Sequence, residues 1–146
     1  MTNLTCHQLP GNSLSFHLLR LIEQYKHNKQ LIIAYDIDDT LRPYHSATCS
    51  TVESSIRAAK DILGAYLIVY TSNPNIDGVR KFLDDNAIPY DSINENATFA
   101  PTSSGKLYYN LFLDDKAGLA QAESVLKDLI YLVLNGYVTK EDDENV

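Results

Sequence analysis

The chain has 146 residues, enough for one ordinary domain with a single substantial core. Its formal net charge is −7, and its 12 basic residues form no cluster along the sequence. Because an extended nucleic acid is bound through clustered Lys and Arg, this charge pattern argues against such a partner. A small phosphorylated molecule needs only one local cation, so that class of ligand stays open.

The start of the chain and its cysteines indicate a cytoplasmic protein. Cys6 and Cys49 have no metal-ligand spacing, and a lone pair in a domain of this size is expected to stay reduced. The first residues lack a basic start followed by an apolar run, and no apolar run is long enough to cross a bilayer. We therefore expect a soluble cytoplasmic domain without a membrane partner.

The first half of the chain alternates between helical and strand patterns. Apolar residues at helical spacing predict an amphipathic helix over residues 13–27. The run LIIAY, 31–35, is continuously apolar and short, which is typical of a buried parallel strand. A capping box at 50–53 then opens a helix that Gly64 ends, and AYLIVY, 65–70, is the second buried strand.

The second half repeats this alternation. An apolar stripe predicts a third helix after Pro74, and a short strand is expected at 88–93. The apolar run LYYNLFL predicts a strand at 107–113. A helix over 119–129 follows, and IYLVL, 130–134, is expected as the final strand.

Strands that alternate with helices, each strand continuously apolar, predict an α/β fold. We expect a doubly wound, Rossmann-like parallel sheet of about five strands with helices on both faces. The chain is expected to form a single domain over residues 1–146. Its core would span about 30–134, with the N-terminal helix outside that core and an acidic tail at 140–146.

Carboxylates directly follow two of the predicted strands. Asp36 and Asp38 follow the strand at 31–35, and Asp114 follows the strand at 107–113. The carboxyl ends of parallel strands meet at one edge of the sheet, where doubly wound folds bind their ligands. Convergent carboxylates repel one another unless a cation shares their charge, and Mg²⁺ is an ion that such oxygens suit. The sequence therefore predicts a magnesium site.

Groups suited to a phosphoryl oxygen accompany these carboxylates. Thr71, directly after the second predicted strand, offers a hydroxyl and a main-chain N–H. Lys106 offers one positive charge just before the strand at 107–113. Metal, hydroxyl, lysine and a free carboxylate are together the parts that phosphoryl transfer requires.

These residues resemble a known family. DIDDTL (36–41) is similar to the DxDxT signature of the haloacid dehalogenase-like (HAD) hydrolase superfamily. A threonine at a strand end (VYTSN), a downstream lysine (GK) and a strand-terminal acidic pair (LFLDDK) follow in the order that this family uses. The resemblance covers roughly residues 30–134. It implies a Mg²⁺-dependent phosphatase, because the second Asp of the motif marks the phosphatase branch.

The resemblance implies a role for each matching residue. Asp36 would be the nucleophile that forms a phosphoaspartate, Asp38 would protonate the leaving group and then activate water, and Lys106 would hold the phosphoryl group. The implied metal ligands are Asp36, Asp38, Asp114 and Asp115, the last directly or through water. The implied substrate-binding residues are Thr71, Ser72, Asn73, Arg42 and Thr40, and Thr40 would also brace the loop. Asp39 sits at a variable position of the motif and receives no role.

The spacing of the motifs leaves no room for the separate cap domain that the family usually adds. The expected elements use up residues 41–70 and 72–105, so the resemblance implies a capless member with an open site. The segment RPYHS would then form a flap over the site. Its side chains Arg42, Tyr44 and His45 are the candidates for contacting the rest of the substrate.

Two other functions stay open beside a phosphatase for a small phosphorylated substrate such as a nucleotide or sugar phosphate. A receiver-type phosphoacceptor module also uses an acidic pocket, a hydroxyl and a lysine. There the lysine follows the last carboxylate, whereas Lys106 precedes Asp114. A non-catalytic domain could instead keep the metal pocket to bind a partner. The oligomeric state is open too, and a neighbouring subunit of a homo-oligomer could supply the missing cap.

Overall fold

Four short strands form one parallel sheet at the centre of the protein. They are β1 (Ile32–Tyr35), β2 (Tyr66–Val69), β3 (Ser92–Ile93) and β4 (Leu111–Leu113). In the sheet they lie in the order β3, β2, β1 and β4, and every neighbouring pair is parallel. The structure is a computed structural model, and it describes residues 15–41 and 51–141.

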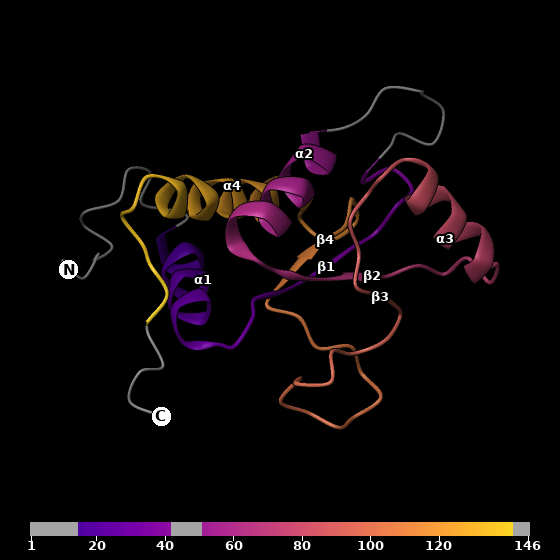
Figure 1. Ribbon diagram of the computed structural model, residues 1–146, viewed down its shortest axis with the longest axis horizontal. Coiled ribbons are helices and arrows are strands. Elements are labelled where there is room, and N and C mark those ends of the chain that lie inside the picture. Colours follow the sequence, from indigo (N-terminus) through magenta and orange to yellow (C-terminus); the bar gives the residue numbers. More distant parts are fainter. Residues whose placement is uncertain (1–14, 42–50, 142–146) are drawn as a thin grey trace.

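Helices precede, connect and follow these strands (Figure 1). They are α1 (Ser15–His27), α2 (Thr51–Ala58) with its π-helical continuation η2 (Ala59–Leu63), α3 (Ile76–Asp85) and α4 (Leu119–Leu134). Gly64 ends η2 with a left-handed φ of 62°, which glycine adopts without strain, and this helix end is where the sequence predicts it. The expected α/β fold with a parallel sheet is confirmed.

The expected fifth strand at 130–134 is wrong, because these residues are the last part of α4. Leu126 and Leu129 are buried at helical spacing, whereas Tyr131 and Leu134 are exposed. A short apolar run does not by itself distinguish a buried strand from the end of a helix. The sheet therefore has four strands, and β4 forms one of its edges.

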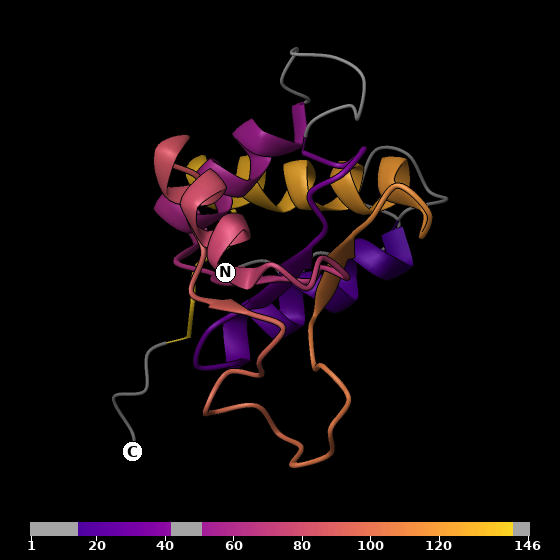
Figure 2. The same cartoon turned by 90° about the vertical axis from the view of Figure 1, so that its right-hand side faces the viewer.

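Alternate residues of the strands face two different layers. Ile33 and Tyr35 of β1 belong to the large core, to which all the described helices contribute, whereas Ile32 and Ala34 belong to a smaller cluster. The smaller cluster is covered by residues 94–110, which Figures 1 and 2 show on the side of the sheet opposite α2, α3 and α4. No described helix contributes to it, so the expectation of helices on both faces is wrong.

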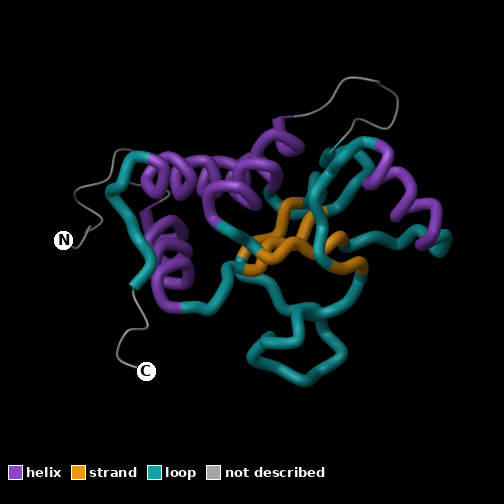
Figure 3. Tube along the Cα trace, in the orientation of Figure 1, coloured by secondary structure: helices purple, strands orange, loops and turns teal. Residues whose placement is uncertain are grey.

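The covering segment 94–110 is a loop throughout (Figure 3). Its sequence between Thr98 and Gly105 is rich in proline, glycine and hydroxyl residues, which favour turns over periodic structure. The chain therefore crosses from β3 to β4 without a helix, and one face of the sheet has a thin cover.

Strand β4 is shorter than the expected strand at 107–113, and Asn110 explains the difference. Asn110 Oδ1 accepts the N–H of Ile32 at 2.8 Å, while the N–H of Asn110 donates to the carbonyl of Ile32 at 2.8 Å. A side chain thus takes the place of a main-chain carbonyl, and regular pairing begins one residue later. The strand expected at 88–93 is likewise reduced to Ser92–Ile93.

The residues after α4 return to the end of α1. Lys140 Nζ donates to the main-chain carbonyls of Asn28 and Lys29, and the N–H of Glu141 donates to the carbonyl of Lys26. Because α1 also packs against α4, the two ends of the described chain support each other.

The described residues contain no inserted domain. Residues 51–70 include α2, η2 and β2, and residues 72–105 include α3, β3 and a loop, as expected for a chain without a cap. Residues 13, 14 and 142–146, at the start of the expected N-terminal helix and in the acidic tail, lie outside the described residues. No described helix has the length and apolar character that crossing a bilayer requires.

Candidate active site

Three carboxylates converge where β1 and β4 end. Asp36 follows β1, and Asp114 and Asp115 follow β4. Each offers one oxygen, and these oxygens all lie within 4.8 Å of one another. Strand pairing brings them together, because the N–H of Asp36 donates to the carbonyl of Leu113 at 3.0 Å. The expectation that these two strand ends meet is confirmed.

The environment of Asp36 raises its pKa. Partial burial is the largest cause, because it disfavours the charged carboxylate, and the charges of Asp114, Asp115 and Asp38 act in the same direction. A hydrogen bond from the main chain of Ile37 opposes them. The cluster thus carries its negative charge at a free-energy cost that a cation would relieve.

Asp114 and Asp115 are adjacent carboxyl groups that interact. Hydrogen bonding to the Asp114 carboxyl group is the largest cause of the raised pKa of Asp115, followed by desolvation and by the charge of Asp114. Two carboxyl groups this close repel each other when both carry a charge. A set of oxygen donors of this kind, with Asp36 beside it, fits a hard divalent cation such as Mg²⁺.

Thr40 links the two loops that carry the carboxylates. Its Oγ1 accepts the main-chain N–H of Asp115 at 3.0 Å, and its side chain is fully buried. This contact fits the bracing role that the resemblance to HAD hydrolases implies for Thr40. Full burial does not fit the second expected role, direct contact with a substrate.

The loop after β1 turns back on itself. The N–H groups of Thr40 and Leu41 both donate to the carbonyl of Ile37, at 3.3 and 2.9 Å. Asp39 adopts a left-handed φ of 60°, which Asp tolerates better than most residues. The chain therefore bends directly after Ile37.

Asp38 lies beside the cluster. Its side chain is exposed, and its carboxylate is not one of the three that converge. Its charge still contributes to the raised pKa of Asp36, so the two groups interact. An exposed carboxyl group in this place can exchange protons with solvent, as a general acid and base must.

The main-chain N–H of Thr71, expected to face a phosphoryl oxygen, donates instead to Asn94 Oδ1 at 2.9 Å. Asn94 Nδ2 donates in return to the carbonyl of Thr71 at 2.9 Å, which ties the end of β2 to the end of β3. Thr71 Oγ1 accepts the N–H of Asn73 at 3.1 Å and keeps its own hydrogen as a donor. Ser72 and Asn73 are exposed beside it.

The sequence pattern alone does not single out Asn94. Its signal is its position directly after a strand, where it adopts a left-handed φ of 56° that Asn tolerates. An Asn or Asp in that position is a candidate for holding a neighbouring strand end.

Lys106 lies in the loop at 94–110, away from the carboxylates. Its carbonyl accepts Asn96 Nδ2 at 3.0 Å, and nearby Tyr108 packs in the cluster of Ile32, the first residue of β1. Asp36 follows the last residue of that strand. The described structure therefore places the loop around Lys106 near the amino ends of the strands, whereas the carboxylates lie at the carboxyl ends. The catalytic role of Lys106 stays a prediction.

Lys116 is a positively charged neighbour of Asp115. It lowers the pKa of Asp115, against the other causes, and the Lys116 N–H donates to Asp114 Oδ1 at 3.1 Å. Lys106 is not among the groups that shift the pKa of Asp36 or Asp115.

The expected flap, RPYHS, lies outside the described residues. The structure describes the chain up to Leu41 and again from Thr51. The substrate contacts expected of Arg42, Tyr44 and His45 therefore stay predictions.

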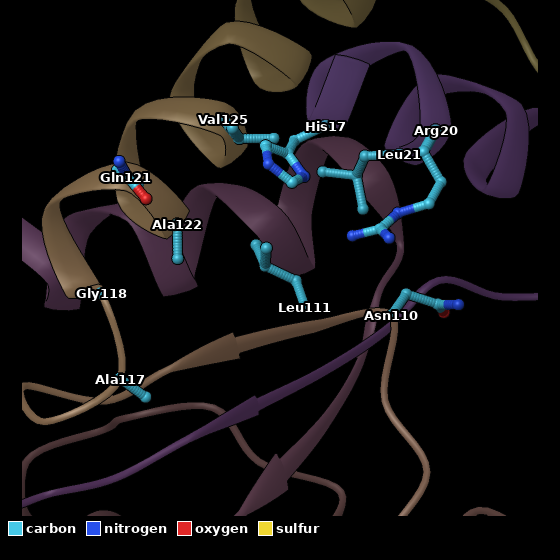
Figure 4. Close-up of a pocket in the computed structure, with 10 residues that line it drawn as sticks. All are labelled: His17, Arg20, Leu21, Asn110, Leu111, Ala117, Gly118, Gln121, Ala122 and Val125. Atoms are coloured by element: carbon cyan, nitrogen blue, oxygen red, sulfur yellow. The ribbon is translucent and has the colours of Figure 1, made fainter. Parts of the chain in front are cut away.

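A separate cavity of about 180 Å³ lies between α1, the edge strand β4 and the start of α4 (Figure 4). Leu21, Leu111 and Val125 give it apolar walls, and Arg20 and His17 border it from α1. None of the residues expected to bind metal or phosphate lines this cavity. It is therefore a feature distinct from the carboxylate cluster.

Comparisons with known proteins identify no relative of the chain. No family model, no curated protein and no solved structure matches it. The resemblance to HAD hydrolases accordingly rests on the four motifs in the sequence.

Proposed function

We propose that the protein is a Mg²⁺-dependent phosphatase that hydrolyses a phosphate monoester through a phosphoaspartate on Asp36. The observation that carries this proposal is the convergence of Asp36, Asp114 and Asp115, whose oxygens lie within 4.8 Å of one another at neighbouring strand ends. The order of the HAD-like motifs along the chain supports it.

The donor set supports Mg²⁺ as the cofactor. Asp36 and Asp114 would bind the ion with the main-chain carbonyl of Asp38, and Asp115 would bind directly or through water. The ion would share the negative charge of the carboxylates and of the phosphoryl group, which otherwise repel each other. Besides burial, which is the largest cause at Asp36, the neighbouring carboxylates contribute to the raised pKa values of Asp36 and Asp115, and a cation would relieve this repulsion.

The residues of the chain would then carry two chemical steps. In the first, a carboxylate oxygen of Asp36 attacks phosphorus, the bond from phosphorus to the ester oxygen breaks, and Asp38 donates a proton to the leaving alkoxide. In the second, Asp38 takes a proton from water, the water oxygen attacks phosphorus, and inorganic phosphate leaves Asp36. The exposure of Asp38 suits this exchange of protons.

The strand end after β2 would hold the phosphoryl oxygens. Thr71 would donate its hydroxyl hydrogen, and Ser72 and Asn73 are exposed beside it. Asn94, which pairs with the main chain of Thr71 through two hydrogen bonds, would keep this segment in place. Fixed donors of this kind stabilise a phosphoryl group because they need no reorganisation during the reaction.

Two lysines are candidates for the positive charge on the phosphoryl group. The order of the motifs favours Lys106, whereas the electrostatic contact with Asp115 favours Lys116. Both are retained in the proposal, and paired variants separate them.

The proposed substrate is a small phosphorylated molecule. The net charge of −7 argues against an extended nucleic acid, and the lack of an inserted domain between residues 51 and 105 leaves the site open. A cytoplasmic location is the accompanying prediction, and a homo-oligomer whose neighbouring subunit covers the site is compatible with this substrate class.

Phosphate release from a panel of small phosphate esters, with Mg²⁺ and with a chelator, tests the proposal. We expect many phosphates released per chain with Mg²⁺ and none with the chelator. A receiver-type module would instead form a single long-lived acyl phosphate per chain. A non-catalytic metal pocket would bind Mg²⁺ without either result, and that outcome would overturn the proposal.

A further inference from the structure

A row of three aromatic rings lies on the face of the sheet that no described helix covers. The ring of Tyr70 packs edge-on against Phe112 with 5.4 Å between centroids, and Tyr109 packs against Phe112 at 5.0 Å. Tyr70 and Tyr109 are 47% and 37% exposed, respectively. We call these three side chains the aromatic row.

The aromatic row begins beside the carboxylate cluster. The N–H of Tyr70 donates to the carbonyl of Tyr35 at 2.8 Å, so strand pairing continues one residue past β2 and sets Tyr70 next to Asp36. Neighbouring strands lie about 4.8 Å apart, so the two main chains are that close. Phe112 lies on β4, on the other side of β1 from Tyr70, two residues before Asp114.

The two tyrosines within the strands are covered by other parts of the protein, unlike Tyr70. Tyr35, on the opposite face, is fully buried and donates its hydroxyl to the carbonyl of Pro89 at 2.7 Å. Tyr66 lies on the same face as Tyr70 but packs edge-on against Phe99 of the covering loop, with 5.6 Å between centroids. The loop therefore covers Tyr66 at the start of β2 and leaves Tyr70, directly after the carboxyl end of that strand, exposed.

We propose that the aromatic row binds a planar ring in the alcohol part of the substrate, so that the preferred substrates are nucleoside monophosphates and not sugar phosphates. This inference rests on the proposed function for the phosphate end of the substrate. With the phosphoryl group at Asp36, the adjoining Tyr70 and then Phe112 and Tyr109 lie along one path across the sheet. Rings stack on a base of any kind, because every base has a π-face.

A matched pair of esters tests the inference. A nucleoside 5′-monophosphate and ribose 5-phosphate carry the same phosphate on the same pentose and differ in the base. We expect the nucleotide to have a KM lower by about 5- to 150-fold, the range that stacking of one base on an aromatic side chain supplies. Equal KM values for the two esters would overturn the inference while leaving the phosphatase proposal intact.

Three variants test whether the lower KM of the nucleotide depends on the aromatic row. Tyr70→Ala should raise the KM of the nucleotide towards that of ribose 5-phosphate and leave the sugar phosphate unchanged, whereas Tyr70→Phe should behave like the wild type. Tyr131→Ala is the matched control, because Tyr131 is 60% exposed on α4, outside the aromatic row. Circular dichroism confirms that each variant is folded. A nucleotide KM that Tyr70→Ala leaves unchanged would overturn the inference.

A binding experiment with a ligand that cannot be hydrolysed separates this inference from the proposed function. An unphosphorylated nucleoside, titrated into the wild-type protein and followed by NMR of the tyrosine rings, should shift resonances that Tyr70→Ala removes. If no ester is hydrolysed but the nucleoside binds in this way, the phosphatase proposal fails and the ring site stands. If no ester is hydrolysed and the nucleoside does not bind, both fail.

Discussion

The hydroxyl oxygen of Thr40 accepts a hydrogen bond from the main-chain N–H of Asp115 at 3.0 Å, across 75 residues of sequence. Thr40 is fully buried, so its hydroxyl group has no water to replace this contact. The bond holds the acidic pair after β4 against the loop after β1. The fold itself, and not the side chains alone, therefore sets the distance between the carboxylates.

Replacing Thr40 by valine tests this link. Valine keeps the shape of the side chain but removes the acceptor of the Asp115 N–H, so the free energy of unfolding should fall by about 0.5–1.5 kcal/mol. Mg²⁺ should also bind more weakly, because the acidic pair loses its support. Urea denaturation and calorimetric titration measure the two effects. Thr40→Ser keeps the hydroxyl and should retain the metal affinity; an equal loss of affinity in both variants would assign the effect to packing.

Asp36→Asn should stabilise the metal-free protein at neutral pH. The raised pKa means that the folded state holds the Asp36 proton more tightly than the unfolded chain does. Stability is therefore lost as the pH rises from the ordinary carboxyl value of about 3.9 through the raised pKa, and the cost is fully present above it. The variant lacks this loss, so thermal unfolding should show a higher melting temperature at pH 7 without metal and no such advantage below pH 4.

The control for that comparison is Asp39→Asn. Asparagine tolerates the left-handed φ of 60° at this position, so the turn is preserved while one nearby negative charge is removed. Its gain in melting temperature should be smaller, because the charge of Asp39 is only a minor cause of the raised pKa of Asp115. Equal gains in both variants would show that the net charge, and not the burial of Asp36, causes the loss of stability at neutral pH.

The lysine that serves the site can be found by comparing Lys116→Ala with Lys106→Ala. Lys116 acts on the charge of Asp115, whereas Lys106 lies in the loop that joins β3 and β4. We expect Lys116→Ala to lower kcat by about 10²-fold and Lys106→Ala to have the smaller effect. Steady-state phosphate release measures both. The reverse order would favour the motif-based role of Lys106 and require the loop to move when substrate binds.

Asn110→Ala tests the side-chain pairing that shortens β4. The N–H of Ile32, a residue that is only 2% exposed, would lose its acceptor, so the free energy of unfolding should fall by about 1–3 kcal/mol. Asn135→Ala is the matched control, because the Asn135 side chain is exposed where it donates to Tyr131. A similar loss in both variants would mean that the contact with Ile32 has no special weight.

The site is more predictable from the sequence than the layers around it. Asp36 and Asp114 each follow a continuous apolar run, and strand ends of a parallel sheet share an edge, so their convergence follows from local pattern. Residues 130–134 carry an equally apolar run but continue a helix, because tertiary packing decides between the two structures.

The contacts of the loop at 94–110 could not be foreseen in the same way. Asn96 donates to the carbonyl of Lys106 and accepts the N–H of Tyr108 at 2.7 Å, and such pairings leave no periodic signal. They hold the two sides of this loop together next to Lys106. The hydrogen bonds between Asn94 and Thr71 are of the same kind.

Steady-state phosphate release with Mg²⁺ by the wild type, Asp36→Asn and Asp39→Asn is the most direct measurement of the proposed activity. On the best ester of the panel, we predict that Asp36→Asn loses turnover by about 10⁴-fold or more while remaining folded, since it lacks the nucleophile. Asp39→Asn should stay near the wild-type rate. Release by Asp36→Asn at the wild-type rate would contradict the assignment of Asp36 as the group that attacks phosphorus.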